Sequence, residues 1–346
     1  MYYRNFTVRE ENEWNSYIER SFEHEIYHTW YYHSLNKEGE PILFVFLEGE
    51  NFIALPIIKR EIKESSFFDM TSVYGYCGPI SNNDLAQCSI LTKQNFKTAF
   101  LNFMKEERCI CIFSRLNPFL NQYLLLENFG GIRDNGKTIY MDLTVPFQNQ
   151  KIKYDKRLSR QIKKLREKQY QIKEANTQIE VKEFTEMYCK NMDRLNASPN
   201  YYFDEQYFTK LLNPKLENKL ILIYDGTELM CGALILLSKN IIRNHLSATS
   251  PKYLKESPSK LLTDEISMIG RRLGKKIFHL GGGVGGREDS LFEFKSHFSD
   301  LQIDDKVWCY INDNIVYNHL TALNGNEIKP NTKYFPLYRK STIIIQ

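Results

Sequence analysis

Short apolar runs alternate along the chain with segments in which apolar residues recur every three or four positions. Runs of the first kind predict strands, and segments of the second kind predict helices with one buried face. In the first half the predicted strands are residues 6–9, 42–47, 52–58, an extended piece before residue 74, 109–113 and 138–143. The predicted helices of that half are residues 10–20, 29–35, 85–106 and 118–127.

The second half repeats this order of elements. Its predicted strands are residues 170–173, 220–224, 228–237, 240–249, 276–280 and 307–311. Its predicted helices are residues 179–196, 204–212, 258–273 and 290–297. Each half runs strand, two helices, three strands, helix, strand, helix and strand, which is the layout of an acetyltransferase-type (GNAT) domain. We therefore expect an α/β (α+β) fold of tandem GNAT-like domains, 1–148 and 149–346, each with a mixed central sheet flanked by helices.

The composition is that of a globular protein with two domains. Of the 346 residues, 42% are hydrophobic and 25% are charged, which is ordinary for a soluble protein and argues against disorder. No apolar run approaches the ~18 residues of a membrane span, and residues 1–14 are too polar for a secretory signal. The seven cysteines are scattered and do not suggest a disulfide framework. We expect a cytoplasmic protein, with a peripheral contact at the inner face of the cell membrane left open.

Positive charge is concentrated in one segment. The whole chain carries +4, but residues 151–173 hold ten Lys or Arg against Asp155 and Glu167, so this segment carries +8 and the rest −4. Leu158, Ile162 and Leu165 recur there at helical spacing, which predicts a basic helix at 155–170 with a narrow apolar stripe. Such a helix either presents a solvated surface or forms an electrostatic binding surface for phosphates, an RNA backbone or an anionic membrane. The stripe is too narrow for a helix that inserts into a membrane.

A glycine-rich loop follows the strand at 276–280. Five of the six residues 281–286 are glycine, so the backbone can bend sharply and approach a ligand closely. The spacing Gly281-x-Gly283-x-x-Gly286 matches a dinucleotide fingerprint, but that fingerprint should open a βαβ unit with an acid some twenty residues later. The strand order here is different, so we reject NAD binding. A plain strand-to-helix connector is the alternative.

Two further elements suit acyl transfer. Asp289 or Ser290 can cap the next helix, and Lys295 on that helix would lie near the glycine loop as a fixed positive charge. Ser257, Ser259 and Lys260 lie between the third meander strand and the following helix, where GNAT domains bind the donor's phosphates. An ordinary Ser-Pro helix start explains these residues equally well.

Catalysis by a nucleophilic side chain finds little support. The sequence has no Gly-x-Ser-x-Gly elbow and no cysteine with an evident histidine partner. The seven histidines do not pair at metal-ligand spacing, so we expect no metal at the site.

Several motifs together resemble the Fem family of peptidoglycan-bridge transferases and their FemAB-like acetyltransferase relatives. The most specific is the Phe-x-Phe-Lys region, Phe292-Glu293-Phe294-Lys295, after Leu280-Gly281-Gly282-Gly283. The other matching residues are Ser257-Pro258-Ser259-Lys260, the basic helix with Arg157, Arg160 and Lys164, the aromatic stretch with Tyr188, Arg194, Tyr201, Tyr202 and Phe203, and the segment from Asp69 through Tyr74-Gly75-Tyr76-Cys77-Gly78-Pro79.

The resemblance implies tandem GNAT-like domains with a cleft between them and an acyl- or aminoacyltransferase activity. The donor would be acyl-CoA or aminoacyl-tRNA as a co-substrate, with no tightly bound cofactor and no metal. The acceptor would be an amine of a nucleotide- or lipid-linked envelope precursor, either a peptidoglycan peptide or an amino sugar. The chain lacks the coiled-coil arm of some members, which weighs against tRNA as the donor. The alternative is a non-catalytic protein that uses the basic helix on RNA or an anionic membrane surface.

Individual residues receive candidate roles, of which the resemblance itself implies those of Phe294 and Lys295. Phe294 and Lys295 would lie at the acyl-donor site. Asp69 is the candidate that binds the acceptor ammonium group or assists its deprotonation. The donor-binding candidates are Ser257, Ser259, Lys260, Gly281, Gly282 and Gly283. The candidates for binding the acceptor or its phosphates are Arg157, Arg160, Lys164, Tyr74, Tyr76 and Tyr202.

Overall fold

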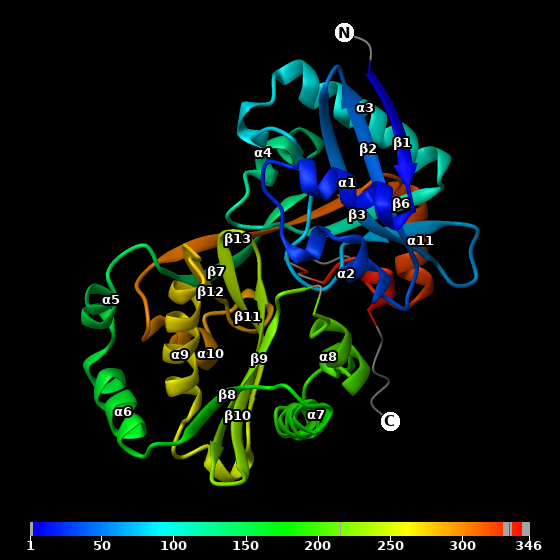
Figure 1. Ribbon diagram of the computed structural model, residues 1–346. Helices are drawn as coiled ribbons and strands as arrows, with labels where there is room; N and C mark the ends of the chain where they lie inside the picture. Colours follow the sequence, from blue (N-terminus) through cyan, green and yellow to red (C-terminus); the bar gives the residue numbers. More distant parts are fainter. Residues whose placement is uncertain (1–2, 215, 328–331, 333, 341–346) are drawn as a thin grey trace. The chain divides into compact units, whose positions relative to one another are not determined.

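The computed structural model describes residues 3–214, 216–327, 332 and 334–340. The chain forms two compact units: unit 1 comprises Met1–Asn135 and Asp305–Gln346, and unit 2 comprises Gly136–Asp304. This division differs from the expected one at residue 148, because the chain enters unit 2 within one strand and returns to unit 1 within another. Each unit contains a mixed sheet flanked by helices, which confirms the expected fold class (Figure 1).

Unit 1 contains a sheet in the order β1-β2-β3-β4-β6-β13, with β5 also paired to β3. Its neighbours are antiparallel except β4 and β6, which are parallel. The strands are β1 (Tyr3–Val8), β2 (Glu40–Glu48), β3 (Asn51–Glu61), β4 (Phe68–Thr71), β5 (Ile80–Ser81), β6 (Cys109–Arg115) and β13 (Gln302–Ile311). The helices are α1 (Glu11–Arg20), α2 (Trp30–Ser34), α3 (Ile90–Glu106), α4 (Gln122–Leu126) and α11 (Asn314–Leu323).

Aromatic packing holds the core of unit 1 together. Helix α3 places Phe96, Phe100 and Phe103 against Phe44 and Phe46 of β2, where the rings of Phe44 and Phe100 meet edge to face at 5.1 Å. Phe100 is fully buried, so its replacement by alanine would cost about 3–5 kcal/mol. Residues of α1 pack into a second cluster with other residues of β2 and β3.

Unit 2 contains a sheet in the order β7-β12-β11-β10-β9-β8. Only β11 and β12 are parallel within it. The strands are β7 (Ile132–Asp142), β8 (Gln171–Glu174), β9 (Lys219–Asp225), β10 (Glu228–Leu237), β11 (Ile241–Thr249) and β12 (Ile277–Gly281). The helices are α5 (Phe147–Lys153), α6 (Lys156–Glu167), α7 (Gln178–Arg194), α8 (Glu205–Leu211), α9 (Ser259–Arg272) and α10 (Ser290–Ser296).

Helices cover both faces of the sheet in unit 2. Helix α9 packs on one face and α7 on the other, as Figure 1 shows. The basic helix expected at 155–170 is α6, and its apolar stripe of Leu158, Ile162 and Leu165 is buried in the core cluster that also contains α9. The stripe therefore holds α6 on unit 2 and leaves the cationic flanks of the helix at the surface.

The last strand of each predicted half lies in the other unit. Residues 139–142 of β7, expected to close the first half, pair with β12 in unit 2. Residues 307–311 of β13, expected to close the second half, pair with β6 in unit 1. The apolar pattern of a strand gives its inward face but not its neighbour, so the sequence could not place these two strands. In the described part of the chain, no helix combines the length and apolar composition needed to cross a membrane.

Candidate active site

The glycine loop begins where two parallel strands of unit 2 part. Residues 241–243 of β11 pair with residues 277–279 of β12. Beyond them β11 continues to Thr249 with β10 as its partner, whereas β12 continues to Gly281 beside β7. Gly281 has φ +80°, a left-handed conformation that suits glycine, and it turns the chain out of the sheet. The loop therefore lies at the end of the interrupted parallel ladder.

Close packing around the loop requires glycine at two more positions. A Cβ atom on Gly282 would lie 2.6 Å from the carbonyl oxygen of Lys137. A Cβ atom on Gly283 would lie 2.0 Å from the carbonyl oxygen of Arg287 and 2.4 Å from Asp289 Oδ1. Backbone and capping atoms thus occupy the space that any side chain would need, and they fix the path of the loop.

Asp289 joins the loop to helix α10. Its Oδ2 accepts a hydrogen bond from the backbone N–H of Val284 at 2.9 Å, and its Oδ1 accepts from those of Leu291 and Phe292 at 3.1 Å. Burial alone would raise the pKa of Asp289, but these backbone donors outweigh it and the pKa is lowered. The carboxylate therefore stays charged, caps the helix as expected and sets the position of α10 against the loop.

Lys295 lies against the glycine loop, as the spacing predicts. Its Nζ donates a hydrogen bond to the carbonyl oxygen of Gly282 at 2.6 Å, and a Cβ atom on Gly281 would lie 3.4 Å from that Nζ. Phe294 packs edge to face against Phe298 at 5.4 Å and borders the core of unit 2. The loop and the helix thus hold an ammonium group at the backbone of the candidate donor site.

The start of α9 is linked to the basic helix rather than to the glycine loop. Lys260 Nζ donates to Gln161 Oε1 at 2.7 Å, and burial together with the nearby charge of Arg157 lowers the pKa of Lys260. Ser257 has φ +53° and donates its hydroxyl to the carbonyl of Leu254 at 3.2 Å, and Ser259 is the first residue of α9. The structure therefore groups Lys260 with the expected phosphate-binding residue Arg157. Arg160 and Lys164 are exposed on the same helix.

The three candidate tyrosines have different surroundings. Tyr202, in unit 2, donates its hydroxyl to Asp193 Oδ1 at 2.8 Å. Tyr76, in unit 1, is buried, and its hydroxyl accepts a hydrogen bond from Arg115 at 2.8 Å. Tyr74, also in unit 1, is 44% exposed. Of the three, Tyr74 and Tyr202 have side chains within reach of a ligand in solution.

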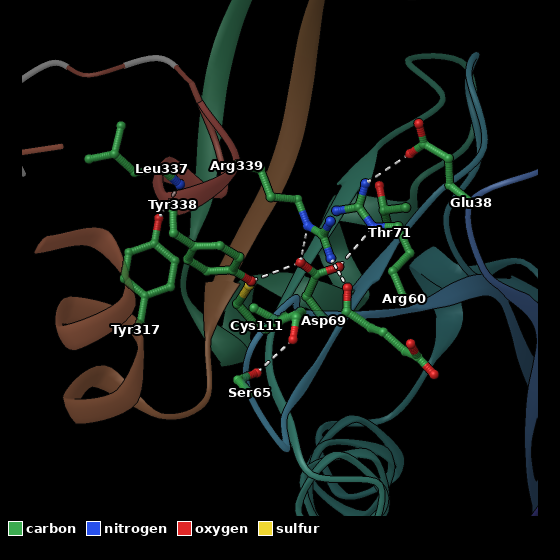
Figure 2. A network of polar contacts seen from close by, with 12 residues as sticks. Glu38, Arg60, Ser65, Asp69, Thr71, Cys111, Tyr317, Leu337, Tyr338 and Arg339 are labelled. Carbon is green, nitrogen blue, oxygen red and sulfur yellow. Dashed lines mark hydrogen bonds and ion pairs between the residues drawn. The ribbon is translucent and has the colours of Figure 1, made fainter. Parts of the chain in front are cut away.

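Asp69 lies at the centre of a buried ion cluster in unit 1, which Figure 2 shows. Its Oδ1 accepts from Arg60 Nε at 2.8 Å, and its Oδ2 accepts from Arg339 Nε at 2.6 Å and from the Tyr338 hydroxyl at 2.8 Å. The carboxylate is 0% exposed and both of its oxygens are occupied. The interpretation of Asp69 as the group that reads or deprotonates the acceptor is therefore corrected: the residue holds the segment Leu337–Arg339 on unit 1.

The cysteines do not offer a thiolate near neutral pH. Burial raises the pKa of Cys77 and of Cys109 to about 12 and that of Cys309 to about 11. Burial is also the main cause that raises the pKa values of the other four, Cys88, Cys111, Cys189 and Cys231. These protonated thiols agree with the sequence evidence against covalent catalysis by cysteine.

Sequence reasoning missed a cavity beside the basic helix. The cavity has a volume of about 420 Å³ and is lined by residues of α5, of α6 and of the link between them. Helix α5 itself was not predicted, because its sequence Phe-Gln-Asn-Gln-Lys-Ile-Lys has too few apolar residues for a clear period. The spacing of Ser159, Lys163 and Glu167 on one side of α6 is the signal that could have pointed to it.

Solved structures share this fold. No model of a known protein family matches the sequence, and no curated protein matches it. The crystal structure of FemX superposes with a TM-score of 0.69 at 10% identity, covering 92% of this chain and 99% of that one. The chain has the FemX fold. L-PGS from Bacillus licheniformis gives a TM-score of 0.58 at 13% identity, covering 88% of this chain and 93% of that one.

A third structure bears on the fold class. A tandem GNAT protein from the clavulanic acid biosynthesis pathway gives a TM-score of 0.51 at 6% identity, covering 90% of this chain and 99% of that one. The FemX-like fold therefore confirms the tandem GNAT-like arrangement that the element order predicts. At these low identities the likeness establishes the fold alone, so the chemistry must be argued from the residues.

Proposed function

We propose that the chain is a GNAT-fold acyl- or aminoacyltransferase that transfers an acyl group to an amine of a cell-envelope precursor. The observation that carries the proposal is the Lys295 ammonium held 2.6 Å from the Gly282 carbonyl oxygen, at the end of the parallel ladder of unit 2. The donor is acyl-CoA or aminoacyl-tRNA. The FemX-like fold and the Phe-Lys pair support this class of reaction.

The reaction is a direct attack of the acceptor nitrogen on the donor's carbonyl carbon. A carbon–nitrogen bond forms, the ester C–O or thioester C–S bond breaks, and the proton lost by the amine balances the proton gained by the leaving hydroxyl or thiol. Lys295 stabilises the negative charge on the carbonyl oxygen in the tetrahedral state. Loss of such a contact typically costs about 10²–10³ in rate.

Holding the donor and the acceptor close together and correctly oriented supplies most of the remaining rate acceleration. Well-oriented reactants gain about 7–11 kcal/mol from proximity alone. Arg157, Arg160 and Lys164 hold phosphates of the donor or acceptor, and Lys260 lies beside Arg157 to extend this cationic surface. Tyr202, on unit 2, contributes an exposed ring for contact with a substrate, and Tyr74, on unit 1, stays a candidate for binding the acceptor.

A binding and turnover experiment tests the proposal. The protein is titrated with a labelled aminoacyl-tRNA acceptor-stem mimic, and the titration is repeated with acetyl-CoA as a competitor. Binding and transfer of the label are both measured for the unchanged chain, for Lys295→Met and for Lys295→Arg. We expect Lys295→Met to lower transfer by about 10²–10³ and Lys295→Arg to retain part of it. Lys190→Met, an exposed lysine on α7, is the matched control.

The outcomes separate the donors and the rival function. Displacement by acetyl-CoA identifies an acyl-CoA enzyme, and saturable binding indifferent to CoA identifies an aminoacyl-tRNA enzyme. Full transfer activity in Lys295→Met would remove the role of this lysine. RNA binding that ignores Lys295 and falls with salt would identify a binding protein without catalysis.

A further inference from the structure

The surface formed by α5 and α6 carries many cations that have no acidic partner among the described residues, although Lys151 Nζ lies 4.5 Å from the ring centroid of Phe147 and Arg160 Nε donates to the carbonyl oxygen of Lys156 at 3.2 Å. Of the ten basic residues between 151 and 173, three are paired: Lys153 with Asp300, Arg166 with Asp264 and Glu265, and Lys173 with Glu180. The other seven form no ion pair with any residue that the structure describes: Lys151, Lys156, Arg157, Arg160, Lys163, Lys164 and Lys168. The charge of Asp155 is used locally, because its carboxylate caps α6 through the N–H groups of Arg157 and Leu158.

Five of these seven cations lie on α6, on the exposed face opposite its buried stripe, whereas Lys168 follows the helix and Lys151 lies on α5. We refer to the two edges of that exposed face as its flanks. Arg157 lies on the flank next to Lys260, together with Arg160 and Lys164, which follow it at helical spacing. Lys163 lies on the other flank and lines the cavity with Lys151. The first flank belongs to the proposed transfer site. The second flank has no role in that chemistry.

The cavity on the second flank combines an apolar wall with cations. Tyr154 and Ile162 supply buried apolar surface, and the lysines at positions 151 and 163 are exposed beside it. Arg166 also lines the cavity but is already bound to Asp264 at 2.6 Å. Glu167 is the single acid in the lining. A volume of about 420 Å³ lies within the range of roughly 300–1,000 Å³ that small-molecule sites occupy.

An isoleucine beside the cavity is exposed to an unusual degree. Ile152 follows Lys151 on α5 and is 82% exposed, whereas Gln150 on the opposite side of that short helix is buried. The flanking residues Lys151 and Lys153 are both exposed. An aliphatic side chain set among lysines is what an anionic lipid surface favours, because the chain enters the headgroup boundary while the ammonium groups contact phosphates.

We propose that the cavity between α5 and α6, with Ile152 at its side, is a docking site for an anionic phospholipid at a bilayer surface. Lys151 and Lys163 bind the headgroup phosphate, Ser159 adds a hydroxyl, and the wall of Tyr154 and Ile162 receives the first carbons of the acyl chains. Ile152 enters the adjacent headgroup layer. The proposal does not depend on the transfer activity, because none of these residues belongs to the proposed transfer site.

The same surface suits single-stranded RNA less well. Proteins that bind single strands stack the bases on exposed aromatic rings. Every residue from 147 to 167 is described, and none of the aromatic side chains there is exposed: Phe147 is half-buried and Tyr154 is buried. The exposed apolar group is aliphatic instead. A membrane partner therefore accounts for Ile152, and RNA does not.

Vesicle co-sedimentation tests the proposal with the full chain. Binding to phosphatidylcholine vesicles that contain about a quarter phosphatidylglycerol is compared with binding to pure phosphatidylcholine. Each lysine near such a surface contributes about fivefold in partitioning, so Lys151→Gln with Lys163→Gln lowers binding by about 25-fold. Lys182→Gln with Lys190→Gln, two exposed lysines on α7, changes it less than twofold.

The aliphatic contact has its own variant and control. Ile152→Ser lowers binding to the anionic vesicles by about tenfold, since burial of such a side chain in an apolar environment is worth roughly that factor or more. Ile315→Ser, on α11 and 84% exposed, leaves binding unchanged. Circular dichroism confirms that each variant is folded. Transfer to a soluble acceptor, where measurable, stays the same in all four variants.

Three results would overturn the proposal. One is equal binding to neutral and anionic vesicles; the second is equal loss in the α7 control and in the cavity variant. The third is tight binding of a single-stranded oligonucleotide or of free glycerol phosphate, sensitive to Lys151 and Lys163, with no vesicle binding. Failure of the transfer assay alone bears only on the proposed function, because the vesicle assay does not use it.

Discussion

The role of Asp69 can be tested with one isosteric substitution. Asp69→Asn keeps the size and shape of the side chain but removes the negative charge between Arg60 and Arg339. Two guanidinium groups then remain with no counter-charge between them, and Glu38, 3.8 Å from Arg60, is the acid that still faces one of them. We expect the variant to lose stability in unit 1 and to leave the chemistry of Lys295 in unit 2 unaffected.

The expected loss of stability follows from the burial of the cluster. Removing one partner of a buried ion pair costs about 3–5 kcal/mol, because the other charge is left uncompensated. The side chain of Asp69 is 0% exposed and that of Arg60 is 12% exposed, but that of Arg339 is 28% exposed and can turn towards water. The lower end, about 3 kcal/mol, is therefore the better value, and for a unit of this size it lowers the Tm by roughly 6–12 °C.

A double-mutant cycle with Arg339 identifies the interaction itself. Arg339→Met alone leaves Asp69 bound to Arg60, so it should cost less than Asp69→Asn. The two changes together should cost less than their sum, with a coupling of about 0.5–3 kcal/mol. Thermal unfolding gives the stabilities, and hydrogen exchange of residues 334–340 shows whether the segment is released.

Activity data provide the result that would refute this reasoning. If Asp69→Asn keeps the Tm of the unchanged chain and its slow exchange at 334–340, yet abolishes transfer, the carboxylate acts on the substrate and the structural assignment is wrong. Arg9→Gln is a suitable control, because Arg9 pairs with Glu40 at an exposed site where ion pairs contribute little.

Other predictions concern the loop and one buried histidine. Gly283→Ala should lower transfer by about a hundredfold and also lower the Tm, since its Cβ would lie 2.0 Å from a backbone oxygen and the loop must shift; steady-state assays check this against Gly226→Ala, which strains a left-handed turn (φ +59°) outside the loop and so controls for lost stability. Asp289→Ala should destabilise the start of α10 by about 1 kcal/mol and speed exchange of the Val284 amide. Burial lowers the pKa of His33 to about 3, so the unfolded chain takes up its proton first as the pH falls from 6.5. Stability should therefore fall between pH 6.5 and about 3, by up to about 1.4 kcal/mol per pH unit, and urea titrations of His33→Phe should lack that component.

Local patterns predicted the elements whose neighbours are close in sequence. The apolar runs at 42–47 and 52–58, with Gly49 between them, correspond to β2 and β3, because a tight turn pairs them directly. The helix predicted at 258–273 is α9 to within a residue. Lys295 was expected beside the glycine loop, and it lies only thirteen positions after Gly282, whose carbonyl oxygen accepts its hydrogen bond.

Long-range contacts set the limit of that reasoning. Arg339 lies 270 positions from Asp69, and no local sequence pattern predicts the contact between these two side chains. Lys260 was assigned to the donor by its place before a helix, whereas its ammonium group contacts Gln161, 99 positions earlier. The tertiary packing of α6 on α9 decides that contact, and a single sequence does not encode it in any periodicity.

The exchange of β7 and β13 has a consequence for biosynthesis. Ile311 of β13 pairs with Cys111 of β6. The sheet of unit 1 is therefore incomplete until this part of β13 has been translated, which happens after the whole of unit 2. At roughly 5–20 residues per second, the ribosome needs on the order of 10–40 s for that interval. During this time the apolar strand β6 has an open edge, which is a template for pairing with other chains. The nascent N-terminal part therefore exposes this edge until β13 is made, while unit 2, continuous in sequence, can fold before it.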